Sequence, residues 1–381
     1  MTINRRQFIQ ASGPALASAA SLSWALPALG KAQNVPGLIK DAEELYARSI
    51  VIAMMSEERQ NAEGLRIIKD SGVTCFSPTL GVRRPEKPDK TYMLQAFPLD
   101  AAVHDCAVWH KFIADNASAL VLVHTTADIK RAKSEGKAAV MLNFQNSPTE
   151  GRLDNIDMFH SLDVLSMQLT YNERNLLGDG STERTDAGLS DFGVASVERM
   201  NELGILVDSA HSGYQTKMDA VKFCKGPAIF SHTNCAALNP HPRNVSDEQI
   251  RALADKGGVM GLTTVSCMVS RNPPATMEDY LNHIDHVVKL VGPDHVGFGP
   301  DSAMHGWPTD PAKKDETLAF YGPPYFKPSY RFRYPMGTEG LNDQHKWKHV
   351  TAGLLKRRYR DNDIMKILGG NWLRVFGAVI G

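Results

Sequence analysis

Eight short apolar runs alternate with amphipathic stretches along this chain, and this alternation constrains the fold more than any other feature. Each run is nearly continuous in apolar residues, which is typical of parallel strands covered on both faces. Strands that alternate with helices form a parallel sheet, and eight strand–helix units close into a (β/α)8 barrel. We therefore predict an α/β fold with a TIM-like barrel. The predicted strands are Ile50–Met54, Val73–Pro78, Ala138–Phe144, Val164–Thr170, Ile205–Asp208, Ala228–Ser231, Val259–Thr264 and His295–Gly299.

No internal repeat, low-complexity segment or long linker divides the chain, so residues 34–381 are predicted to form a single barrel domain. Residues 302–346 are rich in Pro, Tyr, Phe and Gly, and we interpret them as a long loop over the mouth of the barrel. A C-terminal helix is expected over Asp361–Val379, on the outside of the barrel. The other predicted helices are Asp41–Arg48, Ala62–Ser71, Met93–Ala117, Ala127–Ser134, Asp191–Leu203, Gln215–Phe223, Asp247–Lys256 and Thr276–Val291.

The first 33 residues have the features of an export signal. Arg5 and Arg6 precede an Ala-, Ser- and Leu-rich stretch that ends in small residues, which is the pattern of a twin-arginine signal peptide. The stretch is short and is interrupted by glycine and proline, so we expect no stable membrane anchor. We predict that residues 1–33 take the protein through the twin-arginine export machinery to the periplasm. The alternative is an amphipathic helix of the mature protein.

Composition and charge exclude some classes of partner. Lys plus Arg (42) balances Asp plus Glu (42), so nothing favours a nucleic-acid or anionic-membrane surface. The five cysteines are an odd number without a CxxC motif, and we interpret them as small buried apolar residues rather than a disulfide framework.

Three side chains that bind metals in other proteins stand where predicted strands end. His211, His232 and Asp301 each close an apolar run, and the carboxyl ends of barrel strands meet at one mouth. Zinc accepts imidazole nitrogen and carboxylate oxygen, and a catalytic site keeps one position for water. Water bound to zinc reaches a pKa of about 7 and can attack a carbonyl at neutral pH. The barrel is therefore expected to be of the metal-dependent hydrolase type.

The remaining histidines do not recur at equivalent places in consecutive strand–helix units. His283 and His286 are spaced i, i+3 on a predicted helix and could bind a metal, but nothing else in the sequence converges there. We interpret this pair as a solvated face. The same structural or solvent-facing interpretation applies to His104, His110, His124 and His160.

The sequence around these strand ends resembles the membrane (renal) dipeptidase family of zinc peptidases. The resemblance covers roughly residues 50–381 and is stronger from residue 168 onward. The stretches that carry it are GLSDFG (188–193), NELGILVDSAH (201–211), PAIFSHTN (227–234), PRNV (242–245), VGFGPD (296–301) and GNWLRVF (370–376).

The resemblance implies an amide hydrolase with a dinuclear zinc site. His211 and His232 align with the ligands of one zinc ion. Asp301 aligns with the carboxylate that handles the proton of the attacking water, and Arg243 with an arginine that holds the substrate carboxylate through its guanidinium. We assign Asn172 to substrate binding together with Arg243. The alternative for Arg243 is a surface arginine beside prolines.

The chain departs from the family pattern at three places. The family's His-x-Asp pair on strand one falls on Met54 and Ser56, and its bridging Glu falls on Gln145. These residues are poor ligands for a hard dication, so one metal site is expected to be lost. About one zinc ion is then expected per chain, held by the two histidines with Gln145 or Asp301 as a weaker third ligand. A further active-site His falls on Tyr171, whose phenol could donate a hydrogen bond to a developing oxyanion.

Two acidic residues follow the altered strand-one motif. Glu57 and Glu58 could replace the missing carboxylate, but we interpret them as exposed acids at the start of a helix. The sequence thus predicts a periplasmic hydrolase that cleaves an amide bond in a small peptide-like substrate through a metal-activated water. The alternative is a dipeptidase-fold protein with altered or lost catalysis that binds or matures a peptide-like exported product. A homodimer is possible by resemblance only.

Overall fold

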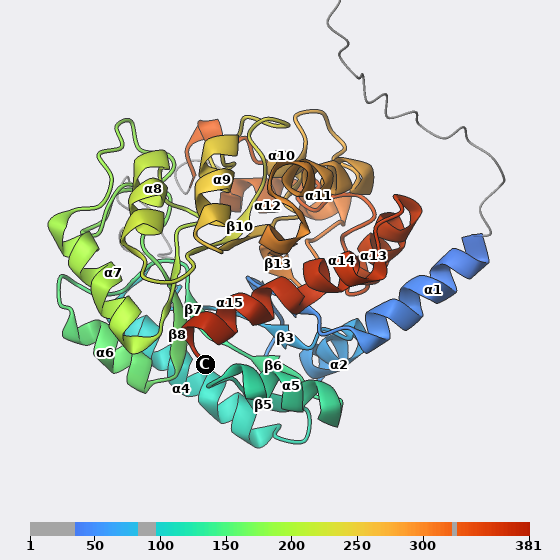
Figure 1. Cartoon of the computed structure of the whole chain (residues 1–381), viewed down its shortest axis with the longest axis horizontal. Coiled ribbons are helices and arrows are strands. Elements are labelled where there is room, and N and C mark those ends of the chain that lie inside the picture. The colour runs from blue at the N-terminus through green and yellow to red at the C-terminus, as the bar shows by residue number, and fades with distance from the viewer. Residues whose placement is uncertain (1–34, 83–96, 322–325) are drawn as a thin grey trace, which may run out of the picture. The chain divides into compact units, whose positions relative to one another are not determined.

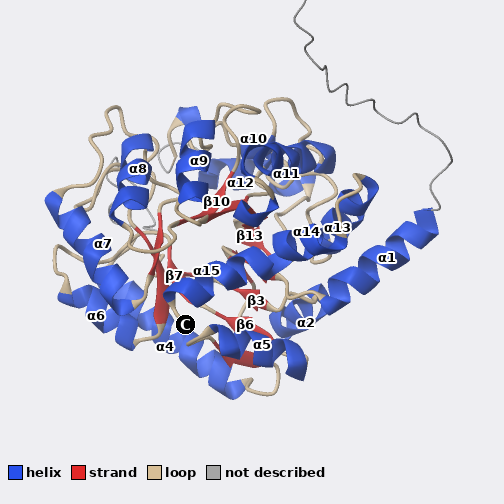
Figure 2. Cartoon of the chain, in the orientation of Figure 1, coloured by secondary structure: helices blue, strands red, loops and turns tan. Residues whose placement is uncertain are grey.

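Eight parallel strands close into a ring, and helices surround it (Figure 1, Figure 2). The computed structural model describes residues 35–82, 97–321 and 326–381. Strand β12 pairs with β1 and so closes the ring, which confirms the predicted barrel. In ring order the strands are β1 (Ile52–Ala53), β3 (Cys75–Phe76), β6 with β7 (Ala138–Val140, Leu142–Phe144), β8 (Val164–Gln168), β9 (Leu206–Asp208), β10 (Ile229–Thr233), β11 (Val259–Leu262) and β12 (Val296–Phe298).

Two of the predicted strands differ from the observed ones. The strand predicted over Val73–Pro78 is observed as β3 alone, and a separate strand β4 (Thr79–Leu80) follows Pro78, which has no N–H for the sheet. The other divides at Met141 into β6, which pairs with β3, and β7, which pairs with β8. Strand β5 (Leu120–Leu122), which we did not predict, adds to β6 and is not part of the ring.

Amphipathic helices join the strands, as predicted. The helix α9 begins with the capping box expected after a serine: Ser246 caps the Gln249 N–H, and the Gln249 side chain caps the Ser246 N–H. Three of the helices given below, α6, α10 and α13, were not predicted. None of the described helices is long and apolar enough to cross a lipid bilayer. Apart from α12 and the C-terminal helices described below, the helices are α1 (Val35–Arg48), α2 (Ala62–Ser71), α4 (Leu99–Asp115), α5 (Thr126–Glu135), α6 (Asp154–Ser161), α7 (Asp191–Leu203), α8 (Tyr214–Phe223), α9 (Asp247–Asp255), α10 (Ser266–Val269), α11 (Met277–Val291) and α13 (Lys346–Lys356).

The C-terminal helix is broken and covers the amino end of the barrel rather than its outer wall. It consists of α14 (Asp361–Met365), a π-helical turn (Lys366–Gly370) and α15 (Asn371–Val379). The break falls at Gly369, where a Cβ atom would lie 2.4 Å from a carbonyl oxygen beside β1. Trp372 is fully buried against the first residues of several strands. This packing closes the end of the barrel opposite the predicted site.

The prediction of one long loop over residues 302–346 was wrong in its secondary structure. The segment contains β13 (Ser302–Ala303), which pairs with β2 (Ser56–Glu57), and the helix α12 (Lys314–Tyr321). Acidic residues in the first turn of α12 interact favourably with the positive end of the helix dipole. The Asp310 side chain caps the 3-10 turn that precedes the helix. The aromatic residues that suggested a loop instead line a cavity described below. The predicted signal peptide 1–33 lies outside the described residues.

Candidate active site

Two histidine side chains meet at the carboxyl end of the barrel. His211 follows β9, and His232 lies near the end of β10, so the parallel register brings them together. Their Nε2 atoms are 2.8 Å apart, and both residues are almost completely buried. Burial, reinforced by the positive charge of Arg243, lowers the pKa of both imidazoles well below the usual value. Both rings are therefore neutral at neutral pH, as metal ligands must be.

The hydrogen-bond partners assign the tautomers of both rings. His211 donates its Nδ1–H to Asn172 Oδ1, at 2.8 Å. The Ser231 hydroxyl donates to the Asp208 carboxylate, so its oxygen accepts the Nδ1–H of His232 at 2.8 Å. Both Nε2 atoms then present lone pairs toward the same point. Such pairs repel each other unless a proton or a metal ion lies between them, so the donor set fits a cation.

Close packing holds the serine that orients His232. A Cβ atom at Gly261 or Gly299 would lie 2.0 Å or 1.9 Å from the Ser231 carbonyl oxygen, so only glycine lets the neighbouring strands approach this closely. Asp208 accepts the backbone N–H groups of Ser231 and Ala210, each at 3.0 Å. Burial raises the pKa of Asp208 to about 6, which leaves it mainly ionised at neutral pH. The ionised carboxylate is the acceptor that the Ser231 hydroxyl needs.

Asp301 lies beside this pair on the segment after β12. Its backbone is in the left-handed region (φ 56°), which aspartate tolerates better than most residues. The preceding carbonyl, of Pro300, accepts hydrogen bonds from the hydroxyls of Thr263 and Thr264. Asp301 Oδ1 lies 3.9 Å from His232 Nε2. Burial raises the pKa of Asp301, against the opposing effect of nearby Arg243.

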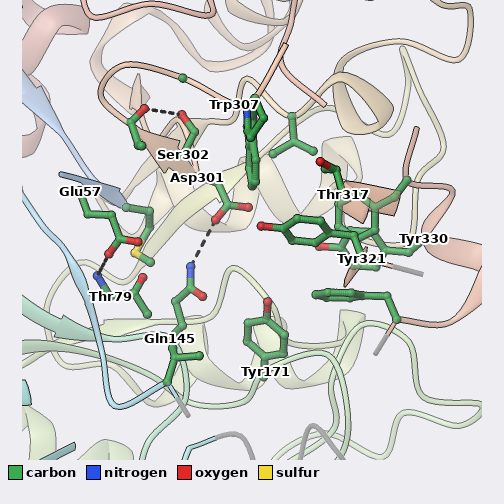
Figure 3. Close-up of a pocket in the computed structure, with 18 of the residues that line it drawn as sticks. Glu57, Thr79, Gln145, Tyr171, Asp301, Ser302, Trp307, Thr317, Tyr321 and Tyr330 are labelled. Atoms are coloured by element: carbon green, nitrogen blue, oxygen red, sulfur yellow. Dashed lines mark hydrogen bonds between the residues drawn. The ribbon is translucent and has the colours of Figure 1, made fainter. Parts of the chain in front are cut away.

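Asp301 forms part of the floor of a cavity of about 940 Å³ (Figure 3). Gln145 donates its amide Nε2–H to Asp301 Oδ1, at 3.3 Å. Tyr171 stacks on the His211 ring, with centroids 4.0 Å apart, and its hydroxyl points into the cavity. The structure therefore brings Asp301, Gln145, Tyr171 and the two histidines together. The imidazoles lie just beneath the cavity lining rather than in it.

The two residues assigned to substrate binding are placed differently from the prediction. Asn172 is buried and does not line the cavity; its Oδ1 accepts a hydrogen bond from the Nδ1–H of His211 instead. Arg243 is fully buried, so the surface alternative is wrong. Its guanidinium donates to the carbonyls of Ala210 and His232 and to the Tyr330 hydroxyl. A substrate contact of Arg243 stays a prediction, and Tyr330 lies between it and the cavity.

Glu57 does not have the environment that we predicted for it. It is exposed, as predicted, but it lies in strand β2 and lines the cavity instead of starting a helix. Its carboxylate faces the cavity, and many protein atoms surround it there. Desolvation raises its pKa to about 7, the hydrogen bond from the Thr79 N–H opposes this, and Asp301 adds to the increase. Glu58 is buried and pairs with His305, at 2.6 Å. The sequence did not indicate that Glu57 faces the cavity while its neighbour Glu58 is buried.

Of the three predicted metal ligands, His211 and His232 converge, and the third stays a prediction. Across residues 35–82, 97–321 and 326–381, no group of three or more His, Cys, Asp or Glu side chains is arranged to hold a metal ion. The two imidazoles converge, and the Asp301 carboxylate, 3.9 Å from His232 Nε2, accepts a hydrogen bond from Gln145. The amide nitrogen of Gln145, not its oxygen, faces Asp301. A ligand role for Gln145 therefore stays a prediction, and the donor set supplies two firm nitrogen ligands.

A parallel barrel with paired neutral imidazoles and a carboxylate at its carboxyl end is the arrangement of a metal-dependent hydrolase. The chain belongs to the membrane dipeptidase family (peptidase family M19), whose family model matches residues 72–313 and 333–380. The family is zinc-dependent. The chain is thus an M19 dipeptidase-like hydrolase by family.

Individual relatives agree with this assignment. The chain is 29% identical over 304 residues to dipeptidase verJ of Clonostachys rogersoniana, covering 78% of this chain and 69% of verJ. It is 29% identical over 262 residues to dipeptidase tcpJ of Claviceps purpurea (strain 20.1), covering 68% of this chain and 55% of tcpJ. The crystal structure of an amidohydrolase from Pseudomonas aeruginosa is similar with a TM-score of 0.75 and 30% identity, covering 89% of this chain and 98% of that chain. The matched region spans only part of the length of the two fungal dipeptidases, verJ and tcpJ.

Replacing Asn172 with alanine is expected to weaken zinc binding by about 10- to 100-fold, because the partner that fixes the His211 tautomer is lost. Equilibrium dialysis with zinc measures the change. Asn362→Ala, at an exposed position of α14, is the matched control and should leave the affinity unchanged. Equal zinc affinity in the Asn172 variant and the parent protein would show that the bond does not orient His211.

Proposed function

We propose that this protein is a periplasmic zinc hydrolase that cleaves the amide bond of a dipeptide or a similar small peptide-like substrate. The observation that carries the proposal is the convergence of two neutral imidazoles, 2.8 Å apart, beside a carboxylate on the floor of a large cavity. Membership of the membrane dipeptidase family supports the choice of an amide rather than another bond. We propose about one zinc ion per chain, because only two firm ligands converge.

In this proposal each residue has a distinct task. His211 and His232 would hold the zinc ion, which polarises a carbonyl and lowers the pKa of water when bound. Asp301 accepts a proton from the attacking water and delivers it to the leaving amine, so that amide and water become carboxylic acid and amine. The Gln145 N–H hydrogen bond favours the ionised form of Asp301. The Tyr171 hydroxyl donates to the carbonyl oxygen as negative charge develops there.

A dipeptide library tests the proposal on zinc-loaded protein. The expected turnover of the preferred dipeptide is that of an ordinary enzyme, on the order of 1–10³ s⁻¹. Absence of turnover across the library, with zinc bound and the fold intact, would favour the second candidate. That candidate is a dipeptidase-fold protein that binds or matures a peptide-like product. The buried Met54, with its sulfur against Ser77, favours it because this strand end offers no ligand.

Export through the twin-arginine route is a separate proposal, supported by the sequence of residues 1–33 alone. Replacing Arg5 and Arg6 together by lysine is expected to prevent export, because that route reads the arginine pair. Cell fractionation with an antibody against the mature domain measures the periplasmic share. The variant Lys40→Arg, a charge-conserving exchange within the mature domain, is the control and should leave export unchanged. Normal export of the double variant would contradict the proposal.

A further inference from the structure

Aromatic side chains cover one side of the cavity. Trp307, Tyr321, Phe326, Tyr330 and Phe332 all line it, and we call them the aromatic wall. The ring centroids are 5.5 Å apart for Trp307 and Tyr321, and 4.4 Å apart for the stacked Tyr330 and Phe332. Tyr321 contacts both Phe326 and Phe332. A continuous surface of rings at a polar reaction centre suits an apolar or aromatic side chain.

The opposite side of the cavity is acidic. Glu57 and Asp105 both line it, and each carboxylate accepts one backbone N–H, from Thr79 and Gly81 respectively. Figure 3 shows Glu57 and Thr79 on one side of Asp301 and the rings of Tyr321 and Tyr330 on the other. His305, a basic group of the lining, is already paired with Glu58. The acidic side therefore suits a cationic group, and the aromatic wall suits a bulky apolar one.

We infer that the site selects peptide-like substrates with a free ammonium group on the acidic side and a bulky apolar residue, preferably aromatic, after the scissile amide. This inference rests on the proposed function and adds the direction in which the substrate lies. The ammonium group pairs with Glu57, and the amide lies at Asp301. The side chain of the second residue packs on the aromatic wall, whose Tyr330 also contacts the guanidinium of Arg243. The substrate carboxylate then lies on the side of the cavity where Tyr330 separates the lining from the buried guanidinium of Arg243.

The size of the cavity agrees with this substrate class. A cavity of about 940 Å³ is at the upper end of the range found for small-molecule sites. A dipeptide of small residues would leave the aromatic wall uncovered. Packing an aromatic ring against the wall removes more apolar surface from water than a methyl group does, so we expect Ala-Phe to exceed Ala-Ala in kcat/KM by roughly 10- to 100-fold.

The experiment compares Ala-Phe with Ala-Ala on the zinc-loaded protein and on its Tyr321→Ala variant. In the variant, KM for Ala-Phe is expected to rise about tenfold or more, while kcat for both substrates and KM for Ala-Ala change little. Tyr214→Ala, at an exposed tyrosine of α8, is the matched control and should preserve the preference. A parent protein without a preference for Ala-Phe, or an equal loss for both substrates in the variant, would overturn the inference.

The acidic side is tested with acetylated substrate. The parent protein should discriminate against N-acetyl-Ala-Phe, and Glu57→Gln should reduce this discrimination. If neither dipeptide is hydrolysed, calorimetric binding of Ala-Phe and Ala-Ala replaces kinetics. Preferential binding of Ala-Phe that is lost in Tyr321→Ala would then support the inference while the proposed hydrolysis fails. Equal binding of the two dipeptides would overturn the inference as well.

Discussion

Replacing His211 with alanine is expected to remove bound zinc and to reduce kcat/KM for dipeptide hydrolysis by at least about 10³-fold. One of only two converging nitrogen ligands is lost, and the Lewis acid that it helps to hold is worth several kcal/mol, where each 1.36 kcal/mol is tenfold in rate. Zinc content by mass spectrometry and steady-state kinetics, measured on the same preparation, check this expectation.

The control for this variant is another histidine that does not line the cavity. His104→Ala, at an exposed position of α4, should keep both zinc and activity. An unchanged thermal unfolding curve would show that the His211 variant is folded. A folded His211→Ala protein that retains zinc and hydrolyses dipeptides at the parental rate would exclude His211 as a ligand.

Asp301→Asn is expected to lower kcat by about 10²- to 10⁴-fold and to leave zinc bound. A neutral amide cannot accept the proton of the attacking water, and general base catalysis contributes a factor of this size. The two converging imidazoles of His211 and His232 remain in this variant, which is the reason to expect that zinc stays.

The matched variant is Asp154→Asn, at an exposed aspartate of α6 that pairs with Arg152. It should leave kcat within about twofold, as surface substitutions usually do. Loss of zinc together with activity in Asp301→Asn would mean that Asp301 is a metal ligand, and unchanged kcat would mean that another group accepts the proton.

The barrel could be predicted because its strands are buried on both faces and so are nearly continuous apolar runs. The same logic placed His211, His232 and Asp301 at strand ends, where parallel strands bring distant residues together. Hydrophobic patterning does not report where a strand is interrupted. The split at Met141 and the extra strand β5 depend on pairing between strands, and so they were missed.

The roles of individual polar residues were harder to predict, because they depend on the direction of side chains. Asn172 and Arg243 turn inward to His211 and to backbone carbonyls, whereas Glu57 turns into the cavity. Nothing in their local sequence distinguishes these directions. The aromatic composition of residues 302–346 did indicate a segment over the barrel mouth, but it was predicted as a loop, without the helix α12.

Zinc content per chain, followed through chelation and reconstitution together with dipeptide hydrolysis, tests the central claim most directly. The two converging imidazoles predict about one zinc ion per chain, loss of hydrolysis when a chelator removes it, and recovery of activity when one equivalent is returned. Full dipeptide turnover by the metal-free protein would contradict the account.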